Sequence, residues 1–305
     1  MISQQKKCFE YEISEKREGN ITYIDVWDVE GFSVSKTFDC GQCFRFRPVE
    51  GSLHEEEFSG VVFGRFISVA RDGKRLRIYN CDETFFKERL YCYLGLCDDY
   101  RAIRQDIANR CPTEYMLSVM ENGEGIRILR QDSWEALCSF IISQNNNIAR
   151  IKKIINALCQ KCGEEIDASF MTEHGASEKE FAFPSPEAVM ALGIDGLREL
   201  RVGFRASYIY DGARRVALGE TDLTKIQKSD WQTAISELTK IRGVGLKVAS
   251  CTALFGMAKL EAFPIDVWIR RMLDEHFPKD FDPLLLGEYA GIAQQYMFYS
   301  ATLKK

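Results

Sequence analysis

The sequence predicts an α+β protein in which an N-terminal antiparallel β-sheet domain with helices precedes an all-α core. Two observations predict this class. Residues 8–80 alternate apolar and polar side chains between Gly, Asn and Asp residues, as half-buried strands do. From Ser133 onward, apolar residues recur at helical spacing in one segment after another. Because the pattern changes near residue 115, we predict domains at 1–115 and 116–305.

The predicted strands occupy six stretches of the N-terminal domain. They are residues 11–15, 21–29, 32–38, 43–49, 57–71 and 75–80. Asp72-Gly73 is a two-residue sequence typical of a β-hairpin turn, so we expect antiparallel pairing. Residues 82–110 then become helical.

The C-terminal part is predicted to be a series of helices with recognisable ends. Ser133 is the expected N-cap of the first, Gly163 is expected to close the second, and Ser185-Pro186-Glu187 opens the third. Later helices are predicted over 203–219, 229–241, 246–258, 266–277 and 283–303. Residues 164–183 are polar and rich in Glu, and are expected to form a loop.

The stretch 238–267 carries the most specific pattern. A helix ending at Ile241 is followed by the turn Gly243-Val244-Gly245 and by a second helix from Leu246 to Ala258. Both glycines are expected to take positive φ, and the free N–H groups at the start of the second helix suit a phosphate.

Two side chains near this turn suggest chemistry. Lys247 falls in the first turn of the second helix, where the positive end of the helix dipole favours a neutral, nucleophilic amine. Asp266 follows Lys247 by 19 residues and is a good N-cap for the next helix.

Helix, turn and helix together resemble the helix-hairpin-helix of DNA glycosylases, in which Lys247 and Asp266 match the catalytic pair. Four separated stretches extend the resemblance over most of the chain: 41–45, 143–150, the hairpin with Asp266, and 290–298. On these motifs the chain resembles the 8-oxoguanine DNA glycosylase/AP lyase family of the helix-hairpin-helix glycosylase superfamily.

The resemblance implies a bifunctional base-excision repair enzyme that flips 8-oxoguanine, paired with cytosine, out of double-stranded DNA. Lys247 would attack C1′ and form a Schiff base, Asp266 would stabilise the positive charge, and β-elimination would cleave the strand 3′ to the abasic site. The expected partner is damaged duplex DNA, and the expected state is a monomer.

The resemblance also assigns residues to subsites. The base pocket, lined by the last helix (284–305), would be formed by Gly41, Cys251, Pro264, Gln294 and Phe298. The vacated stack and opposite base would be contacted by Asn145, Arg150, Phe204 and Arg205. A phosphate would bind at Gly243, Val244 and Gly245, and a monovalent or divalent cation would bind with DNA at the main-chain carbonyls of Thr239, Ile241 and Val244.

Two positions depart from the family pattern. Trp268 stands where many eukaryotic members have a histidine that touches phosphate, and Phe204 replaces a tyrosine. The first change puts that phosphate contact in doubt, while the second loses a hydroxyl and keeps the ring.

Charge and cysteine content limit the other possibilities. The net charge of −5 predicts no general affinity for nucleic acid, so DNA contact must depend on local basic residues. Candidates for this patch are Arg150, Lys152, Lys153, Arg201, Arg205, Arg214, Arg215, Lys240, Arg242, Arg270 and Arg271.

Eleven cysteines without a signal peptide or membrane span predict a reducing location, cytoplasmic and nucleoid-associated in a prokaryote or nuclear in a eukaryote. No cysteine follows Cys251, so the four-cysteine iron–sulfur loop of some related glycosylases is not expected, and no cofactor is required.

Three alternatives remain open from the sequence. A non-enzymatic DNA-binding scaffold would use the same hairpin without covalent chemistry at Lys247. A zinc or thiol redox protein would use the C-x-x-C pairs Cys40–Cys43 and Cys159–Cys162. A glycosylase for another damaged base would keep the chemistry and change the target.

Overall fold

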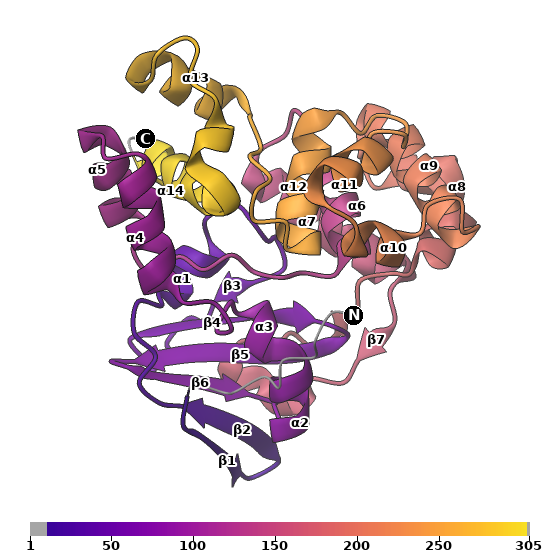
Figure 1. Ribbon diagram of the computed structural model, residues 1–305. Coiled ribbons are helices and arrows are strands. Elements are labelled where there is room, and N and C mark those ends of the chain that lie inside the picture. Colours follow the sequence, from indigo (N-terminus) through magenta and orange to yellow (C-terminus); the bar gives the residue numbers. More distant parts are fainter. Residues whose placement is uncertain (1–10, 304–305) are drawn as a thin grey trace.

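A six-stranded antiparallel sheet forms one layer of the structure, a computed structural model that describes residues 11–303 (Figure 1). The spatial order is β1-β2-β6-β5-β4-β3, so consecutive strands pair with each other except β2 and β3, and β2 pairs with β6 instead. The strands are β1 (Ile13–Glu18), β2 (Ile21–Val26), β3 (Arg47–Pro48), β4 (Glu56–Val62), β5 (Arg65–Asp72) and β6 (Arg75–Tyr79). The predicted α+β class is confirmed. Residues 8–10 of the predicted strand region lie outside the described part.

Four details of the predicted sheet are wrong. Residues 32–38 contain the helix α1 (Val34–Phe38), because the Ser33 side chain caps it by accepting a hydrogen bond from the Lys36 N–H. Stretch 43–49 contributes only the two residues of β3, and 57–71 is split between β4 and β5 by a turn at Gly64, which has φ of 74°. Asp72 pairs with Arg75, so the hairpin turn consists of Gly73 and Lys74.

The helical layer joins helices from both ends of the chain around one hydrophobic core. Figure 1 shows α4, α5 and α13 beside the C-terminal α14, while α6 to α12 form a second group. The α-helices are α4 (Tyr100–Arg110), α5 (Glu114–Asn122), α6 (Ser133–Ser143), α7 (Ile148–Cys162), α8 (Pro186–Glu199), α9 (Ala206–Ala217), α10 (Leu223–Lys228), α11 (Trp231–Leu238), α12 (Leu246–Met257), α13 (Val267–His276) and α14 (Ala290–Leu303). The 3-10 segments among them are η3 (Gly203–Arg205) and η4 (Pro283–Tyr289).

Most predicted helix ends are confirmed. Gly163 follows α7, and Ser185 caps α8 with Pro186 at its first position. Asp132, rather than Ser133, caps α6, because its carboxylate accepts from two first-turn N–H groups. The predicted last helix is also interrupted: Gly287, with φ of 73°, separates η4 from α14, so the regular helix begins at Ala290.

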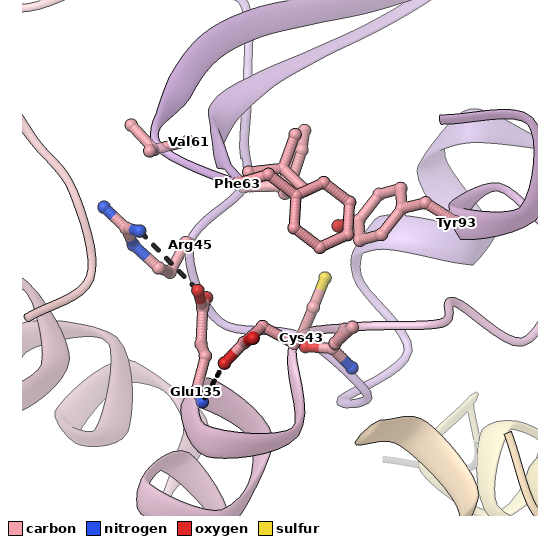
Figure 2. A pocket seen from close by; sticks show the side chains of 10 residues that line it. Cys43, Arg45, Val61, Phe63, Tyr93 and Glu135 are labelled. Carbon is pink, nitrogen blue, oxygen red and sulfur yellow. Dashed lines mark hydrogen bonds and ion pairs between the residues drawn. The ribbon is translucent and has the colours of Figure 1, made fainter. Parts of the chain in front are cut away.

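An ion pair joins the sheet domain to α6. Figure 2 shows Arg45, which follows the 40–43 segment, facing Glu135 in the first turn of α6. Arg45 Nη1 lies 3.8 Å from Glu135 Oε2, and the two side chains are only 10% and 17% exposed. Burial raises the pKa of Glu135 to about 7, although the Arg45 guanidinium acts in the opposite direction.

This buried carboxyl predicts a pH-dependent stability. The folded protein holds the Glu135 proton up to about pH 7, whereas the unfolded chain releases it near pH 4.5, so the free energy of unfolding falls as pH rises between these values. Glu135→Gln has no carboxyl to titrate. Between pH 5 and pH 8 its free energy of unfolding should therefore fall by roughly 1–3 kcal/mol less than that of the wild type. Urea unfolding at both pH values measures the difference. Glu114→Gln, in the exposed first turn of α5, is the control and should keep the pH dependence of the wild type, because Glu135 is intact in this variant.

Residues 164–183 are not the loop that their polarity suggests. They form the short strand pair β7 (Glu165–Ile166) and β8 (Glu180–Phe181), with the 3-10 segment η2 (Ser169–His174) between them. β5 is buried on both faces: Ile67 and Val69 join the core beside α1, while Phe66 and Ala70 point to the other face. Ala168 and Met171 cover this second face, which explains why a polar segment becomes ordered.

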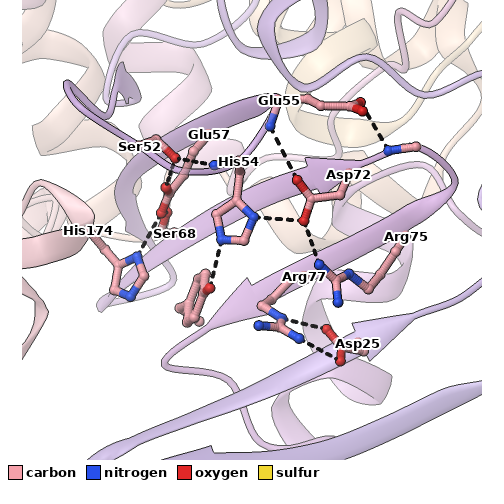
Figure 3. Close-up of polar contacts among 12 residues, drawn as sticks. Asp25, Ser52, His54, Glu55, Glu57, Ser68, Asp72, Arg75, Arg77 and His174 are labelled. Carbon is pink, nitrogen blue, oxygen red and sulfur yellow. Dashed lines mark hydrogen bonds and ion pairs between the residues drawn. The ribbon is translucent and has the colours of Figure 1, made fainter.

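Polar contacts fix this cover to the sheet (Figure 3). His174 Nδ1 lies 2.7 Å from Glu57 Oε1, and the His174 ring stacks on Tyr79 with centroids 3.8 Å apart. His54 bridges Asp72 and Tyr79, with both hydrogen bonds at 2.8 Å. The network belongs to the sheet domain and holds the segment between α7 and α8 against it.

Candidate active site

The hairpin between α11 and α12 has the predicted turn but a different glycine geometry. Gly243 has φ of 78°, and a β-carbon there would lie 2.3 Å from Tyr208 Cδ2, so only glycine fits. Gly245 has φ of −87°, so the predicted positive φ is wrong at this residue. No atom of the described residues lies within 4 Å of the place where its β-carbon would be. The first helix ends at Leu238, not Ile241, and Ala258 closes α12 with φ of 55°.

The N-terminus of α12 is open to an anion. Gly245 is its N-cap and has no side chain to bond the first N–H groups of the helix. The next residue, Leu246, is 72% exposed. A helix start with free N–H groups and a bare glycine beside it suits the close approach of a phosphate.

Lys247 and Asp266 line the same open cleft of about 800 Å³. The cleft also contains the loop between α6 and α7, the exposed ring of Phe204 and the start of α13. The further lining residues are Ser143, Gln144, Asn145, Asn146, Gly245, Val248, Ile265, Val267, Trp268, Arg270 and Arg271. The structure thus brings the two predicted catalytic residues and the predicted stack-entering loop to one surface.

The wall behind Lys247 is formed by α6 and by α12 itself. Its Nζ lies 5.4 Å from the centre of the Phe140 ring, and Cys251 lies one turn further along α12. Burial raises the pKa of the Cys251 thiol, and Lys247 partly offsets this. The two helices come close because Gly256 has no side chain: a β-carbon there would lie 2.7 Å from Ala136 Cβ.

Asp266 is held by its own helix. It is the N-cap of α13, as predicted, and its Oδ1 accepts a 2.8 Å hydrogen bond from the Ile269 N–H. The buried Pro264 lies two residues before it, in the segment that leads from α12 to α13. The cap therefore fixes a carboxylate at the cleft next to the amine-bearing helix.

Two of the predicted base-pocket residues, Gly41 and Phe298, meet from opposite ends of the chain. Gly41 has φ of 80°, and a β-carbon there would lie 3.2 Å from Phe298 Cε1 and 3.8 Å from Ile148 Cδ1. Gln294 lies one turn before Phe298 on α14, so both side chains share a face. Gln294 is only 4% exposed, yet its Oε1 finds no hydrogen-bond partner among residues 11–303. A buried amide oxygen without a partner is costly unless a ligand supplies the donor.

Two buried glutamines that position this pocket have no role in the sequence-based assignment. Gln42 donates to the Thr37 and Arg127 carbonyls and accepts from the Leu129 N–H, all at 2.8 Å. Gln295 donates to the Cys40 carbonyl at 2.9 Å. Together they fix the segment on either side of Gly41. Both lie inside the motifs that carry the resemblance, which was the available signal.

The residues predicted to contact the opposite base lie on the loop after α6 and on η3. Asn145 is exposed and has φ of 47°. Phe204 is 54% exposed, and Arg150 is exposed with one hydrogen bond to the Arg201 carbonyl at 3.2 Å. Arg205 differs from them, because it is only 4% exposed and bonds main-chain carbonyls.

Trp268 carries a cation on its ring. The Arg271 guanidinium lies 5.2 Å from the ring centre, and both residues line the cleft together with Arg270. This arrangement places positive charge beside Trp268 at the cleft.

The cysteines of the two C-x-x-C pairs do not line the cleft, and Cys40, Cys43 and Cys159 are buried while Cys162 is half-buried. Burial raises the pKa of the Cys40 thiol to about 12 and that of Cys159 to about 12, so these thiols are poor nucleophiles. Within residues 11–303, no three His, Cys, Asp or Glu side chains are grouped to bind a metal ion. The same residues include no helix long and apolar enough to cross a membrane.

Comparisons with known proteins agree with this geometry. Residues 24–137 match the family described as 8-oxoguanine DNA glycosylase, N-terminal domain, and residues 138–282 match the HhH-GPD superfamily of base excision DNA repair proteins. The chain is 34% identical to the 8-oxoguanine glycosylase/lyase of Clostridium acetobutylicum, solved with double-stranded DNA containing cytosine opposite 8-oxoG. That match covers 96% of this chain and 98% of the other, with a TM-score of 0.85.

Curated relatives are matched over shorter stretches. The N-glycosylase/DNA lyase of Saccharomyces cerevisiae is 36% identical over 49% of this chain and 41% of its own length. The probable N-glycosylase/DNA lyase of Methanothermobacter thermautotrophicus is 30% identical over 60% of this chain and 65% of its own length. The chain therefore spans about half the length of these relatives.

Proposed function

Because the chain belongs to the 8-oxoguanine DNA glycosylase family, we propose that it excises 8-oxoguanine opposite cytosine from double-stranded DNA and then cleaves the strand as an AP lyase. The observation that carries this proposal is the meeting of Lys247 and Asp266 in one cleft, beside a hairpin whose helix N-terminus is open. The enzyme would act as a monomer and need no cofactor for the chemistry.

The proposed reaction uses the Lys247 amine as nucleophile. Its nitrogen bonds C1′ of the flipped nucleotide while the C1′–N9 bond breaks, and the electron pair leaves with the base. Opening of the sugar then gives an iminium ion, the Schiff base, whose charge makes a C2′ proton acidic. Loss of that proton expels the 3′ phosphate, which is β-elimination.

Asp266 would stabilise the positive charge that develops on the sugar and would not act as a second nucleophile. Positive charge develops on the sugar as the base leaves, and a carboxylate held by the α13 cap is preorganised to stabilise it. The fixed position matters because no reorganisation is then required during the reaction.

The hairpin would bind the DNA backbone. The free N–H groups of α12 can bond a phosphate oxygen, and the bare Gly245 lets it approach. A cation can also be held by the carbonyls of Thr239, Ile241 and Val244. The hairpin residues fit this, because the Ile241 carbonyl accepts one bond, from the Val244 N–H at 3.0 Å, and keeps a second lone pair. When bound, the cation would neutralise charge between hairpin and phosphate.

The lesion would be recognised at Gly41 and α14. 8-Oxoguanine carries a proton on N7 where guanine has a lone pair, so a main-chain carbonyl in that place attracts the lesion and repels guanine. Gly41 is proposed to present this carbonyl, with Cys251 and Phe298 on the two faces of the base. The Gln294 amide oxygen would gain a donor from the base edge, which supports its place in the pocket.

Gly41→Ala should damage lesion excision selectively. The new methyl group would lie 3.2 Å from Phe298 Cε1, on a backbone with φ of 80° that disfavours alanine. We expect single-turnover excision of 8-oxoguanine to fall by about tenfold or more, the equivalent of ~1.4 kcal/mol in the barrier. Binding to undamaged duplex should change little, because phosphate contacts dominate it.

A matched control separates backbone strain from the loss of the pocket. Gly51 has φ of 73° and open space around its β-carbon position, so Gly51→Ala has the strain without the pocket. It should excise like wild type. If Gly41→Ala excises 8-oxoguanine at the wild-type rate, the base pocket must lie elsewhere. The proposed substrate would then be damaged purines in general.

Borohydride trapping tests the proposed function directly. Wild-type protein would be incubated with duplexes that differ only in the lesion and in the base opposite it, and the Schiff base reduced to a stable cross-link. We expect a cross-link with 8-oxoguanine opposite cytosine and none with guanine. No cross-link on any damaged duplex would indicate a non-enzymatic scaffold, and a cross-link only with another lesion would change the substrate.

A further inference from the structure

We propose that Asp211 of α9 positions the DNA-binding hairpin: its carboxylate holds the Arg242 N–H and so aims and polarises the Ile241 carbonyl toward the cation that would bridge hairpin and DNA phosphate. The inference rests on the proposed function, because it takes the hairpin as the part of the protein that binds the DNA backbone. Asp211 would act through a peptide group and is a positioning residue.

Helix α9 packs one face against successive residues of the hairpin turn. A β-carbon on Gly212 would lie 3.7 Å from Ile241 Cγ2, and Asp211 Oδ2 accepts a 3.0 Å hydrogen bond from the Arg242 N–H. The aromatic ring that fills the space over Gly243 comes from the same helix one turn earlier. Spacings of three and four residues place these contacts on one face of α9.

The bond to Asp211 satisfies a donor that the backbone of the hairpin leaves free. The N–H groups of Lys240 and Ile241 bond to carbonyls of α11 at 3.2 and 3.1 Å, and the Val244 N–H bonds to the Ile241 carbonyl at 3.0 Å. The Arg242 N–H lies between them in the chain and bonds to the α9 carboxylate instead. The carboxylate therefore fixes the plane of the peptide group that joins Ile241 to Arg242.

That peptide group also carries one of the proposed cation ligands. The Ile241 carbonyl and the Arg242 N–H belong to one planar unit, and a charge-assisted bond from the N–H draws electron density toward the carbonyl oxygen. Within residues 11–303, the carbonyls of Thr239 and Val244 accept no main-chain hydrogen bond, whereas that of Ile241 accepts one. Asp211 thus strengthens the ligand whose oxygen is already shared.

Two arginines of α9 orient this carboxylate and balance its charge. Arg215 Nε donates to the same Asp211 oxygen at 3.0 Å, and Arg214 Nη2 lies 3.8 Å from the other oxygen. Both arginines also pair with Glu220, at 2.5 and 3.7 Å. Two arginines and two carboxylates carry no net charge, so the cluster does not repel a phosphate at long range.

Two variants separate the local bond from the general effect of charge. Asp211→Asn keeps an oxygen that can accept from the Arg242 N–H but removes the charge, whereas Glu220→Gln removes a carboxylate from the same cluster and leaves the hairpin bond intact. If charge alone mattered, either change should strengthen DNA binding, because it leaves an arginine less compensated beside a polyanion. The proposal predicts the opposite sign for Asp211→Asn.

The full chain would be titrated with a duplex that holds an uncleavable abasic analogue, so that no catalysis is needed. Potassium chloride with EDTA is the medium, because neutral carbonyls suffice as ligands for potassium. Asp211→Asn should bind about threefold or more weakly than wild type, since a residue that orients a cation ligand is lost as a charge. Glu220→Gln should bind equally or more tightly. Unchanged or tighter binding by folded Asp211→Asn would overturn the proposal.

Exchange of the cation tests the carbonyl ligand. Tetramethylammonium at the same chloride concentration keeps the ionic strength but is too large to sit among three carbonyls. Wild type and Glu220→Gln should lose about threefold or more in affinity, and Asp211→Asn less than about 1.5-fold. An equal loss in all three proteins, or no loss in wild type, would overturn the proposal.

One measurement needs no variant. The Arg242 amide proton of ¹⁵N-labelled wild type should resonate at low field, as expected for an N–H bonded to a carboxylate. On addition of the duplex it should shift further in potassium than in tetramethylammonium, and an equal shift in both salts would overturn the proposal. Failure of the proposed function is distinguishable, because wild type would then bind this duplex without forming a borohydride cross-link to damaged DNA.

Discussion

Lys247→Gln is expected to abolish the borohydride cross-link and to reduce base excision by ~10³-fold or more, since removing the attacking amine removes the covalent route. The Lys247 amine lies in the cleft beside Phe140 and Cys251. A glutamine at this position keeps most of the length and the helix propensity of lysine. The fold and the hairpin should therefore survive, and binding to duplex DNA should remain close to that of wild type.

The measurement has three parts. Trapping on an 8-oxoguanine duplex, single-turnover excision and the melting temperature are compared for wild type, Lys247→Gln and Lys225→Gln. Lys225 is an exposed lysine in α10, outside the cleft, and its replacement should change none of the three. A full cross-link from Lys247→Gln would assign the Schiff base to another amine.

The catalytic half of the site was predictable from local chemistry. The cap by Asp266 depends on one side chain and the next turn of backbone, and the Gly243 turn depends on one positive φ, so a short sequence specifies each. What the sequence could not supply is their distance. Their relative position depends on long-range packing, of α12 on α6 with Gly256 close to Ala136 and of α13 on α14.

Elements whose order depends on distant partners were predicted poorly. Residues 164–183 read as a loop because their few apolar residues, such as Met171, matter only against the second face of β5. Residues 32–38 alternate like a strand, but the Ser33 cap and the burial of Val34 and Phe38 make them helical. Gly245 shows the same limit at one residue: the N-cap requires an extended backbone where a positive φ was expected.

Positioning residues were missed for a related reason. Gln42 and Gln295 act by bonding main-chain carbonyls, and nothing in a sequence indicates which carbonyls lie nearby. A motif gives the residue type and not its partner.

Asp266→Asn should separate the two roles of this residue. Asn is nearly as good an N-cap as Asp, so the bond to the Ile269 N–H can be kept and the free energy of unfolding should change by less than about 0.5 kcal/mol. The charge that would stabilise the sugar is lost, so excision should fall by ~10²-fold or more, the size of effect seen when one preorganised electrostatic group is removed.

Two further variants make the Asp266 experiment decisive. Asp266→Ala removes cap and charge together, and should cost roughly 0.5–2 kcal/mol of stability in addition to the rate. Asp230 caps α11 through a 2.8 Å bond from the Thr233 N–H and does not line the cleft, so Asp230→Asn controls for the exchange of Asp by Asn at a cap. Melting temperature and single-turnover excision would be measured for all three. If Asp266→Asn excises the lesion at the wild-type rate, the carboxylate serves only α13, and charge stabilisation must come from another group in the cleft.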